Sequence, residues 1–363
     1  MKSYPIPMVP GPVKVPPSVL AAYQFDFGSA DIELEFLDLY NQTETQLQTL
    51  LKTKNRIAIQ TGEGMLALWG ALKSCILPGD RVLAISTGLF GLGIGEMASQ
   101  IRAKVKMINL RDDQTISDFA QIESAIIEFN PKMITVVHCE TPSGTLNPIH
   151  TLGELKTKHN VPLLYVDAVA SIGGAPVLTD EWSIDLLLGG SQKCLSAPPA
   201  ISFVAMSEKA QEIINAVNYV GYDALKPFLT AQKDFYFPYT PHWQGMAALS
   251  TAVQLILDEG TDSCYRRHAK IAEYCRKRLS EIDYRLFPAQ DAIPSPTVTA
   301  IYVPEGISWS ELDHRFRQRG LVVGGNYGAL AGKVFRIGHM GSQADMDLIE
   351  RALVIAEKTI KKI

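Results

Sequence analysis

The chain has 363 residues with 34 basic and 38 acidic side chains, which gives a formal net charge of −4. Hydrophobic residues make up 47% of the chain and charged residues 20%, a balance typical of a globular protein with one large or two ordinary domains. This balance gives no electrostatic reason to expect binding to nucleic acid or to an anionic membrane.

No uninterrupted apolar run is long enough to span a bilayer, and the first residues, MKSYPIPMVPGP, lack the apolar core of a signal peptide. The five cysteines are scattered and show no spacing typical of metal ligands. They are Cys75, Cys139, Cys194, Cys264 and Cys275. We therefore expect a reduced, cytoplasmic protein without a metal site.

The N-terminal residues 1–17 are rich in proline and predict an extended arm rather than a helix. An amphipathic helix is predicted over about 32–51, and a buried strand over 56–60. The turn Thr61–Gly64 joins this strand to a helix predicted over 65–73. Free N–H groups at such a helix start are a common phosphate site, although an ordinary strand-to-helix turn is an equal alternative.

Six further buried strands are predicted along the chain. They are predicted over 81–85, 105–110, 133–137, 161–166, 184–188 and 201–206. Strands that alternate with helices, such as the one predicted over about 116–129, indicate an α/β fold. We expect a doubly wound, mostly parallel sheet of seven strands with helices on both faces.

The segment 215–234 is predicted to be loop-like, and a long helix begins near residue 244. Strand-like runs recur over 297–303, 321–325 and 334–341. We therefore expect a large domain over residues 18–258 and a smaller C-terminal α+β domain over residues 259–363.

The most informative stretch is the strand over 184–188 and the loop that follows it. Lys193 lies in this loop, between Gly190 and the Pro198–Pro199 pair that prevents a helix. Open α/β sheets bind ligands at the carboxyl ends of their strands, and a partly desolvated lysine there can attack an aldehyde. Taken alone, a surface lysine in a turn would be the commoner case.

A carboxylate at a neighbouring strand end favours the functional interpretation. The strand over 161–166 ends at Asp167, and Ser191 and Gln192 stand beside Lys193. This combination suits a pyridoxal cofactor, with Lys193 forming the Schiff base and Asp167 pairing with the protonated pyridine nitrogen.

The motifs VDAVASIGG, from Val166, and DLLLGGSQKCLSAPPAISFVAMS, from Asp185, resemble class V aminotransferases of fold type I. The likeness is to the alanine–glyoxylate and serine–glyoxylate branch. It extends to MVPGPVKVPPSVL, HCETPSGTLNPI, YTP and FRIGHMG, and so covers essentially the whole chain. Several separate motifs in the family's order are far more specific than any one of them.

The resemblance implies a set of site residues. Phe90 is expected to stack on the cofactor ring, and Thr141 to hydrogen-bond the cofactor. The remaining cofactor-binding residues that it implies are Glu63, Gly64, Met65, Asp167, Ser191, Gln192, Lys193 and Thr240. In this family the Thr240 segment reaches the neighbouring subunit, so we expect a homodimer with shared active sites.

The resemblance also implies a substrate site. Arg336 stands in an apolar strand, where an arginine must be paired or must face a polar ligand. It is expected to hold the substrate carboxylate with its two-pronged guanidinium. The N-terminal arm, with Gly11, is expected to lie beside the substrate.

The function expected from these residues is a ping-pong transamination. An amino group would move from a small amino acid to a small 2-oxo acid, glyoxylate or pyruvate, through pyridoxal 5'-phosphate. Lys193 would act as general base and then acid, while Asp167 keeps the ring nitrogen protonated. A cysteine desulfurase is disfavoured, because no cysteine follows Cys275.

Three residues depart from the family's phosphate cup, namely Glu63, Met65 and Phe237. A negative charge about 4 Å from a phosphate costs roughly 4 kcal/mol at an effective dielectric near 20. That corresponds to about a thousandfold in affinity. Gly62–Glu63 and the Lys193–Cys194–Leu195 run are similar to pyridoxamine–pyruvate aminotransferase, which uses unphosphorylated pyridoxamine. That branch carries a second arginine near the position of Asn326, which is absent here, and so both vitamers remain open.

Overall fold

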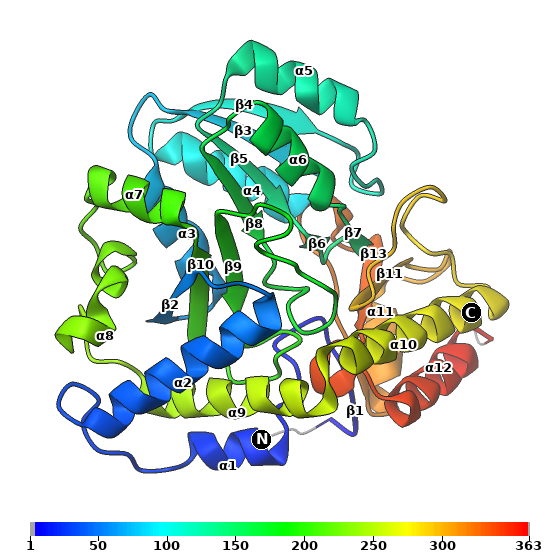
Figure 1. Ribbon diagram of the computed structural model, residues 1–363. Coiled ribbons are helices and arrows are strands. Elements are labelled where there is room, and N and C mark those ends of the chain that lie inside the picture. Colours follow the sequence, from blue (N-terminus) through cyan, green and yellow to red (C-terminus); the bar gives the residue numbers. More distant parts are fainter. Residues whose placement is uncertain (1–3, 362–363) are drawn as a thin grey trace.

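A computed structural model describes residues 4–361 (Figure 1), and its centre is a seven-stranded sheet. In spatial order the strands are β2 (Arg56–Thr61), β10 (Ile201–Met206), β9 (Leu186–Gly190), β8 (Leu163–Asp167), β5 (Met133–Val137), β3 (Arg81–Ser86) and β4 (Lys104–Asn109). Only β10 runs antiparallel to its neighbours, so the prediction of a mostly parallel sheet of seven strands is confirmed.

The register brings the carboxyl ends of the central strands to one edge. Asp167, the last residue of β8, pairs with Leu188 of β9 and with Val137 of β5. Strand β9 ends two residues later at Gly190, and Lys193 follows directly in the loop. The parallel pairing therefore places the predicted carboxylate and the predicted lysine at neighbouring strand ends.

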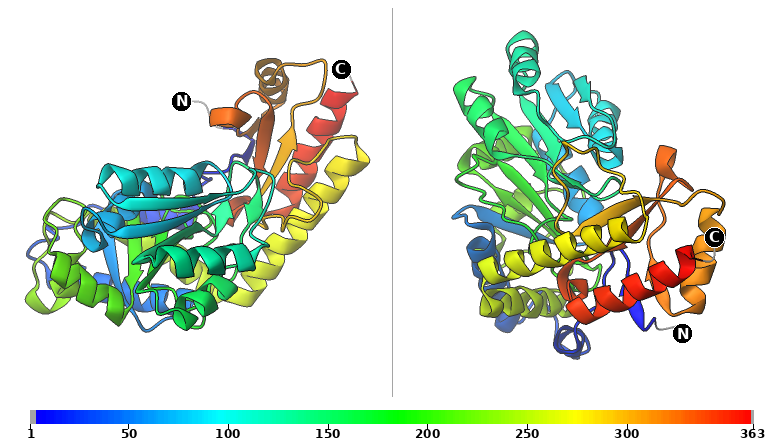
Figure 2. Two further views of the ribbon diagram at one scale, coloured as in Figure 1. Left: turned by 90° about the horizontal axis from the view of Figure 1, so that it is seen from above. Right: turned by 90° about the vertical axis from the view of Figure 1, so that its right-hand side faces the viewer.

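Helices cover both faces of the sheet (Figures 1 and 2), as expected for strands whose residues are buried throughout. The helices of this part of the chain are α1 (Pro17–Tyr23), α2 (Leu34–Leu51), α3 (Gly64–Cys75), α4 (Leu89–Gln100), α5 (Phe119–Phe129), α6 (His150–Lys158), α7 (Glu208–Val217), α8 (Ala231–Asp234) and α9 (Trp243–Glu259). Among them, α1 packs on α9 rather than on the sheet. The prediction that 215–234 is loop-like is wrong in part. Helix α7 ends within it, and it contains α8 and the 3₁₀ turn η1 (Lys226–Leu229), because its apolar Phe228 is buried in the core.

The C-terminal part begins where Gly260 ends α9 with a positive φ of 83°. Its elements are α10 (Thr261–Glu281), β11 (Val298–Tyr302), α11 (Trp309–Gln318), β12 (Leu321–Val323), η2 (Gly328–Leu330), β13 (Val334–Gly338), η3 (Gly341–Gln343) and α12 (Met346–Ile360). Strands β11 and β13 pair in antiparallel fashion. The division into domains at residue 258 stays a prediction.

The N-terminal arm joins this C-terminal part. Strand β1 (Ile6–Met8) pairs in parallel with β12, and Ile6 and Met8 are buried in the same apolar cluster as Leu321 and Ile337. Beyond β1 the chain turns toward the edge of the large sheet where Lys193 lies. Residues 1–3 of the predicted arm and residues 362–363 of the predicted small domain lie outside the described residues.

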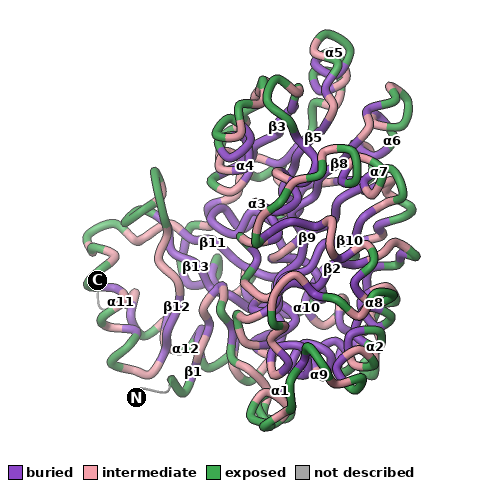
Figure 3. The backbone as a smooth tube through the Cα atoms, turned by 90° about the vertical axis from the view of Figure 1, so that its left-hand side faces the viewer, coloured by how far each residue is buried: buried purple, intermediate pink, exposed green. Residues whose placement is uncertain are grey.

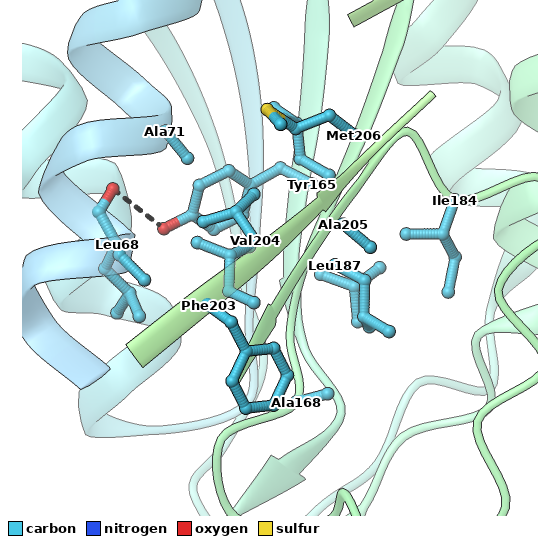
Figure 4. Close-up of a cluster of buried hydrophobic side chains, with 14 of the residues drawn as sticks. Leu68, Ala71, Tyr165, Ala168, Ile184, Leu187, Phe203, Val204, Ala205 and Met206 are labelled. Carbon is cyan, nitrogen blue, oxygen red and sulfur yellow. Dashed lines mark hydrogen bonds between the residues drawn. The ribbon is translucent and has the colours of Figure 1, made fainter. Parts of the chain in front are cut away.

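Most of the apolar core lies between the large sheet and its helices, as the buried strands in Figure 3 show. Figure 4 shows part of this core, where Tyr165 of β8 packs beside Phe203 of β10 and Leu187 of β9. The Tyr165 hydroxyl donates a hydrogen bond to the Leu68 carbonyl oxygen at 3.1 Å. This bond fixes the first turns of α3 relative to the strand that carries Asp167.

Candidate active site

A cavity of about 120 Å³ opens at the carboxyl edge of the sheet. It lies where β8 and β9 end and where α3 and α4 begin. Its lining residues are Glu63, Gly64, Met65, Leu68, Phe90, Cys139, Thr141, Asp167, Val169, Ala170, Gln192 and Lys193. The fold thus gathers eight of the predicted site residues around one space.

Lys193 is the amine of this cavity. Its Nζ donates a hydrogen bond to the Pro10 carbonyl oxygen at 2.8 Å, so the N-terminal arm touches the lysine directly. Burial lowers the pKa of Lys193 below that of an ordinary lysine, and the nearby Arg336 cation lowers it further. A lowered pKa leaves more of the amine neutral near pH 7, and only the neutral amine attacks an aldehyde.

Asp167 is the buried carboxylate of the cavity and is 6% exposed. Its Oδ1 accepts a hydrogen bond from the Val169 backbone N–H at 3.0 Å. Burial raises the pKa of Asp167 to about 6, against the lowering effects of that hydrogen bond and of Lys193. A cationic ring nitrogen placed here would hold the carboxylate ionised.

The start of α3 forms the end of the cavity at which a phosphate is expected. Glu63 is the N-cap residue of α3, and its Oε1 accepts from the Met65 backbone N–H at 3.2 Å. Its Oε2 accepts from Gln192 Nε2 at 3.1 Å. The carboxylate of Glu63 therefore already engages donors that a phosphate would use.

Gln192 and Met65 complete this end of the cavity. Gln192 Oε1 is buried and accepts no hydrogen bond from another described residue. Met65 presents its side chain at the exposed rim, where it supplies no polar atom. Phe237, the third departure from the family's cup, is buried in the core against Phe36 and Tyr40.

The walls of the cavity are largely apolar. Phe90, on the first turn of α4, lines it together with Val169 and Leu68. A Cβ on Gly64 would lie 3.0 Å from Val169 Cγ2, so glycine keeps α3 close to this wall. An apolar slot that contains two carboxylates, Asp167 and Glu63, and one amine fits a flat cationic ring better than an anionic one.

Arg336 lies outside the lining of this cavity but close to it. Its residue is 3% exposed, and its Nε and Nη2 donate to the Gly325 carbonyl oxygen at 2.8 and 2.6 Å. The Tyr327 ring lies 5.0 Å from the guanidinium carbon. Among residues 4–361 Arg336 forms no ion pair, and besides the Gly325 carbonyl oxygen its guanidinium interacts with Tyr327. A buried cation without a carboxylate partner suits an anionic ligand.

Two predicted residues do not reach the cavity of their own chain. The Ser191 hydroxyl donates to the Pro198 carbonyl oxygen at 2.5 Å, and so it braces the loop that carries Lys193. Thr240 donates to Asp31 at 3.0 Å at the surface. His138, just after the end of β5, is buried, and its Nδ1 lies 2.9 Å from Ser171 Oγ.

Gly11, which was expected beside the substrate, lies against Lys193. Its φ of 93° is in the left-handed region that favours glycine, and a Cβ here would stand 2.4 Å from Lys193 Cδ and 2.6 Å from Nζ. We expect Gly11→Ala to displace the lysine and to lower kcat about tenfold or more, since misplaced groups commonly cost that much. The steady-state rate measures this effect, and Gly332→Ala, another positive-φ glycine with open space around it, is the control. An unchanged kcat in Gly11→Ala would contradict the contact.

Five residues of the site were not predicted. Leu68, Val169 and Ala170 line the cavity, and so does Cys139; Pro10 supplies the carbonyl for Lys193. The position of Val169, two residues after Asp167, and of Leu68, one helical turn after Gly64, are the signals that could have found them.

Between residues 4 and 361, no three His, Cys, Asp or Glu side chains come together as metal ligands would. Within the same residues, no helix combines the length and the apolar character needed to cross a bilayer.

The residues fit a pyridoxal cofactor. Lys193 could hold its aldehyde carbon, Asp167 its ring nitrogen, and Phe90 and Val169 its two faces. The unpartnered Gln192 Oε1 and the cradle at Gly64 agree with a ligand between β9 and α3. This combination of lysine, buried aspartate and apolar slot at the edge of a mostly parallel sheet is the arrangement expected of a fold type I pyridoxal enzyme.

Comparison with known proteins agrees with this class. The chain matches the family described as Aminotransferase class-V over residues 20–334 and belongs to it. It is 35% identical to an uncharacterized aminotransferase of Methanocaldococcus jannaschii, over 98% of this chain and 92% of the relative. It is 31% identical to the pyridoxamine–pyruvate transaminase of Mesorhizobium japonicum, over 93% and 87%. A solved alanine–glyoxylate aminotransferase from Nostoc sp. superposes with a TM-score of 0.93 at 28% identity, covering 99% of this chain and 96% of that chain.

Proposed function

We propose that this enzyme uses pyridoxal 5'-phosphate to move an amino group from a small amino acid to glyoxylate or pyruvate. The observation that carries the proposal is the convergence of Lys193 and Asp167 on one apolar cavity. Names of relatives support the acceptors, since they include alanine–glyoxylate and pyridoxamine–pyruvate aminotransferases.

Lys193 and Asp167 have different tasks in this proposal. The cofactor, when bound, supplies an aldehyde that accepts the amino group and a ring that withdraws electrons. Lys193 holds the cofactor, and when the donor amine replaces it, its free amine moves a proton from the donor's α-carbon and later returns one. Asp167 keeps a proton on the ring nitrogen.

Arg336 would position the substrate. The Gly325 carbonyl oxygen takes the Nε–Nη2 edge, so the outer Nη1 and Nη2 donors would hold the carboxylate and orient the α-carbon toward Lys193. Tyr327 covers the guanidinium. The Asn326 side chain donates to the Pro142 carbonyl oxygen at 2.8 Å, which ties the connection between β12 and β13 to the segment that follows β5.

The test is a two-stage assay on the PLP-loaded enzyme. L-Alanine, L-serine and L-aspartate are added separately, and the loss of the cofactor's visible absorption is followed until one equivalent has reacted. Glyoxylate or pyruvate is then added, and recovery of the absorption is expected. A protein that binds PLP but exchanges no amino group in either stage contradicts the proposal.

Pyridoxamine is a second candidate amino donor, and Glu63 is the observation that favours it. Its carboxylate accepts from Met65 N and Gln192 Nε2, at the helix start where a phosphate would bind. Because Glu63 is exposed, solvent screens its charge, and the penalty on a phosphate is smaller than that of a buried pair.

We expect Glu63→Gln to strengthen PLP binding about tenfold or more and to leave pyridoxal binding within about twofold, because only PLP carries the repelled charge. Equilibrium titration of the cofactor-free protein with each vitamer measures both constants. Glu208→Gln is the control, since Glu208 is an exposed glutamate in the first turn of the remote helix α7. Equal effects on the two vitamers would show that Glu63 does not sense the phosphate. Wild-type binding of pyridoxal that equals or exceeds that of PLP would make pyridoxamine the donor.

We further propose a homodimer in a reducing, cytoplasmic compartment. Thr240 stands at the surface, away from its own cavity, where a partner's site could receive it. Large apolar side chains are exposed on nearby segments. They include Phe25, Ile32, Leu34, Val220, Tyr222 and Tyr236.

The five cysteines are buried and unpaired, which suits the proposed reducing compartment.

A further inference from the structure

Glu140 is a buried carboxylate that the proposed reaction does not use. It belongs to the short hairpin of β6 (Cys139–Glu140) and β7 (Thr145–Leu146), and its residue is fully buried. Its Oε1 accepts from the Phe90 backbone N–H at 2.8 Å, and its Oε2 accepts from the Gly91 backbone N–H at 3.2 Å. A buried carboxylate is stable only where hydrogen-bond donors compensate for its loss of water, so these two contacts account for its position.

Those groups are backbone N–H groups in the first turn of α4, which have no acceptor within the helix itself. The helix begins after Gly88, which has no side chain to cap it, so the N–H groups of its first turn need an outside acceptor. Glu140 supplies that acceptor from a different segment, 50 residues away from Phe90. A negative charge at this end of the helix is also stabilised by the helix dipole.

Gly88 makes the approach possible. A Cβ at this position would lie 2.6 Å from Glu140 Cγ and 2.9 Å from Cδ. The backbone of Gly88 is extended, with a φ of 163°, so an alanine would be tolerated by the backbone. The three nearest atoms that its Cβ would meet all belong to Glu140. The structure therefore offers a second way to move the carboxylate without changing Glu140 itself.

The two neighbours of this contact both line the cavity. Phe90 provides one wall, and Thr141, which follows Glu140 directly, provides a hydroxyl. Burial raises the pKa of Glu140 to about 7, while the Phe90 and Gly91 amides favour the ionised form that can accept from both. Glu140 thus links the start of α4, which carries Phe90, to the segment that carries Thr141.

We propose that Glu140 is a positioning residue, which fixes the Phe90 ring over the cofactor by holding the first turn of α4. The inference rests on the proposed function, because the Phe90 side chain can stack on a cofactor ring only if the cavity binds a pyridoxal compound. It assigns Glu140 no proton transfer and no contact with substrate. In Glu140→Gln one oxygen is replaced by an amide donor, which cannot accept from either N–H.

A double-mutant cycle tests the route through Phe90. The dissociation constant for PLP, or for pyridoxal if that binds more tightly, is measured in the wild type, Glu140→Gln, Phe90→Ala and the double variant. We expect Glu140→Gln to weaken binding about tenfold in the wild-type background and less than about twofold in the Phe90→Ala background. Additive effects would show that Glu140 does not act through Phe90.

A second readout needs no cofactor. Amide hydrogen exchange of the peptide that contains Phe90 and Gly91 is expected to accelerate in Glu140→Gln and in Gly88→Ala. Glu44→Gln is the matched control, since buried Glu44 also accepts a backbone N–H, that of Ile57, at 2.8 Å, far from the cavity. It is expected to lower thermal stability without changing cofactor binding or exchange at Phe90.

The outcomes separate this inference from the proposed function. If the wild type binds a vitamer and the exchange at Phe90 is unchanged in both variants, the inference is wrong and the proposed function stands. If Glu140→Gln does not fold, Gly88→Ala alone must show the faster exchange and the weaker binding. A wild type that binds neither vitamer contradicts the proposed function and the inference together.

Discussion

Lys193→Ala is expected to abolish the visible absorption of the covalently held cofactor and to lower kcat by about 10³-fold or more. Lys193 has two tasks, to hold the cofactor and to move the proton, and no other described lysine lines the cavity. Absorbance of the PLP-loaded variant and its steady-state rate measure the two losses.

Lys132→Ala is the matched control for this prediction. Lys132 is also partly buried and is paired with Asp80 at 2.7 Å, but it lies at the opposite end of the sheet, just before β5. It is expected to lose some stability and to keep the absorption and the rate. Normal turnover by Lys193→Ala would mean that another group carries the chemistry.

Asp167→Asn is expected to lower kcat by about 10²- to 10³-fold while cofactor remains bound, as for the loss of a preorganised electrostatic partner. Asparagine fills the same space and can still accept from Val169 N, but it carries no charge to keep a proton on the ring nitrogen. The rate of the amino-donor half-reaction and the spectrum of the bound cofactor measure the effect.

Asp185→Asn separates the loss of charge in the site from the loss of any buried carboxylate. Asp185 is also buried, and it accepts from Leu164 N, Ser207 Oγ and Lys156 at about 2.8 to 2.9 Å, remote from the cavity. It is expected to lower the unfolding temperature and to leave kcat near that of the wild type. An Asp167→Asn enzyme as fast as this control would contradict the proposal that Asp167 keeps a proton on the ring nitrogen.

The sheet was predictable because each strand is a short apolar run bounded by turn residues. Burial on both faces removes the alternation that a half-exposed strand would show, and it leaves runs such as 133–137 and 201–206, which the structure reproduces residue for residue. Once the strands are parallel, the placement of Asp167 and Lys193 at one edge follows from chain direction alone.

Contacts made across long sequence separations were not predictable in the same way. Pro10 accepts from Lys193, 183 residues later, only because β1 pairs with β12 and carries the arm to the site. Glu63 was recognised as a charge in the phosphate turn, but the hydrogen bond from Gln192 depends on how β9 and α3 pack. The cap that Glu140 provides for α4 has no local motif, because the acceptor and the amides lie on different segments.

In the proposed enzyme Lys193 carries the cofactor in the cavity beside Asp167. Borohydride reduction of the PLP- or pyridoxal-loaded protein, followed by peptide mass spectrometry, locates this bond. We expect one equivalent of reduced cofactor per chain, on the peptide that contains Lys193 and on no other. Label on a different lysine, or no label in a protein that shows bound cofactor by absorption, would contradict it.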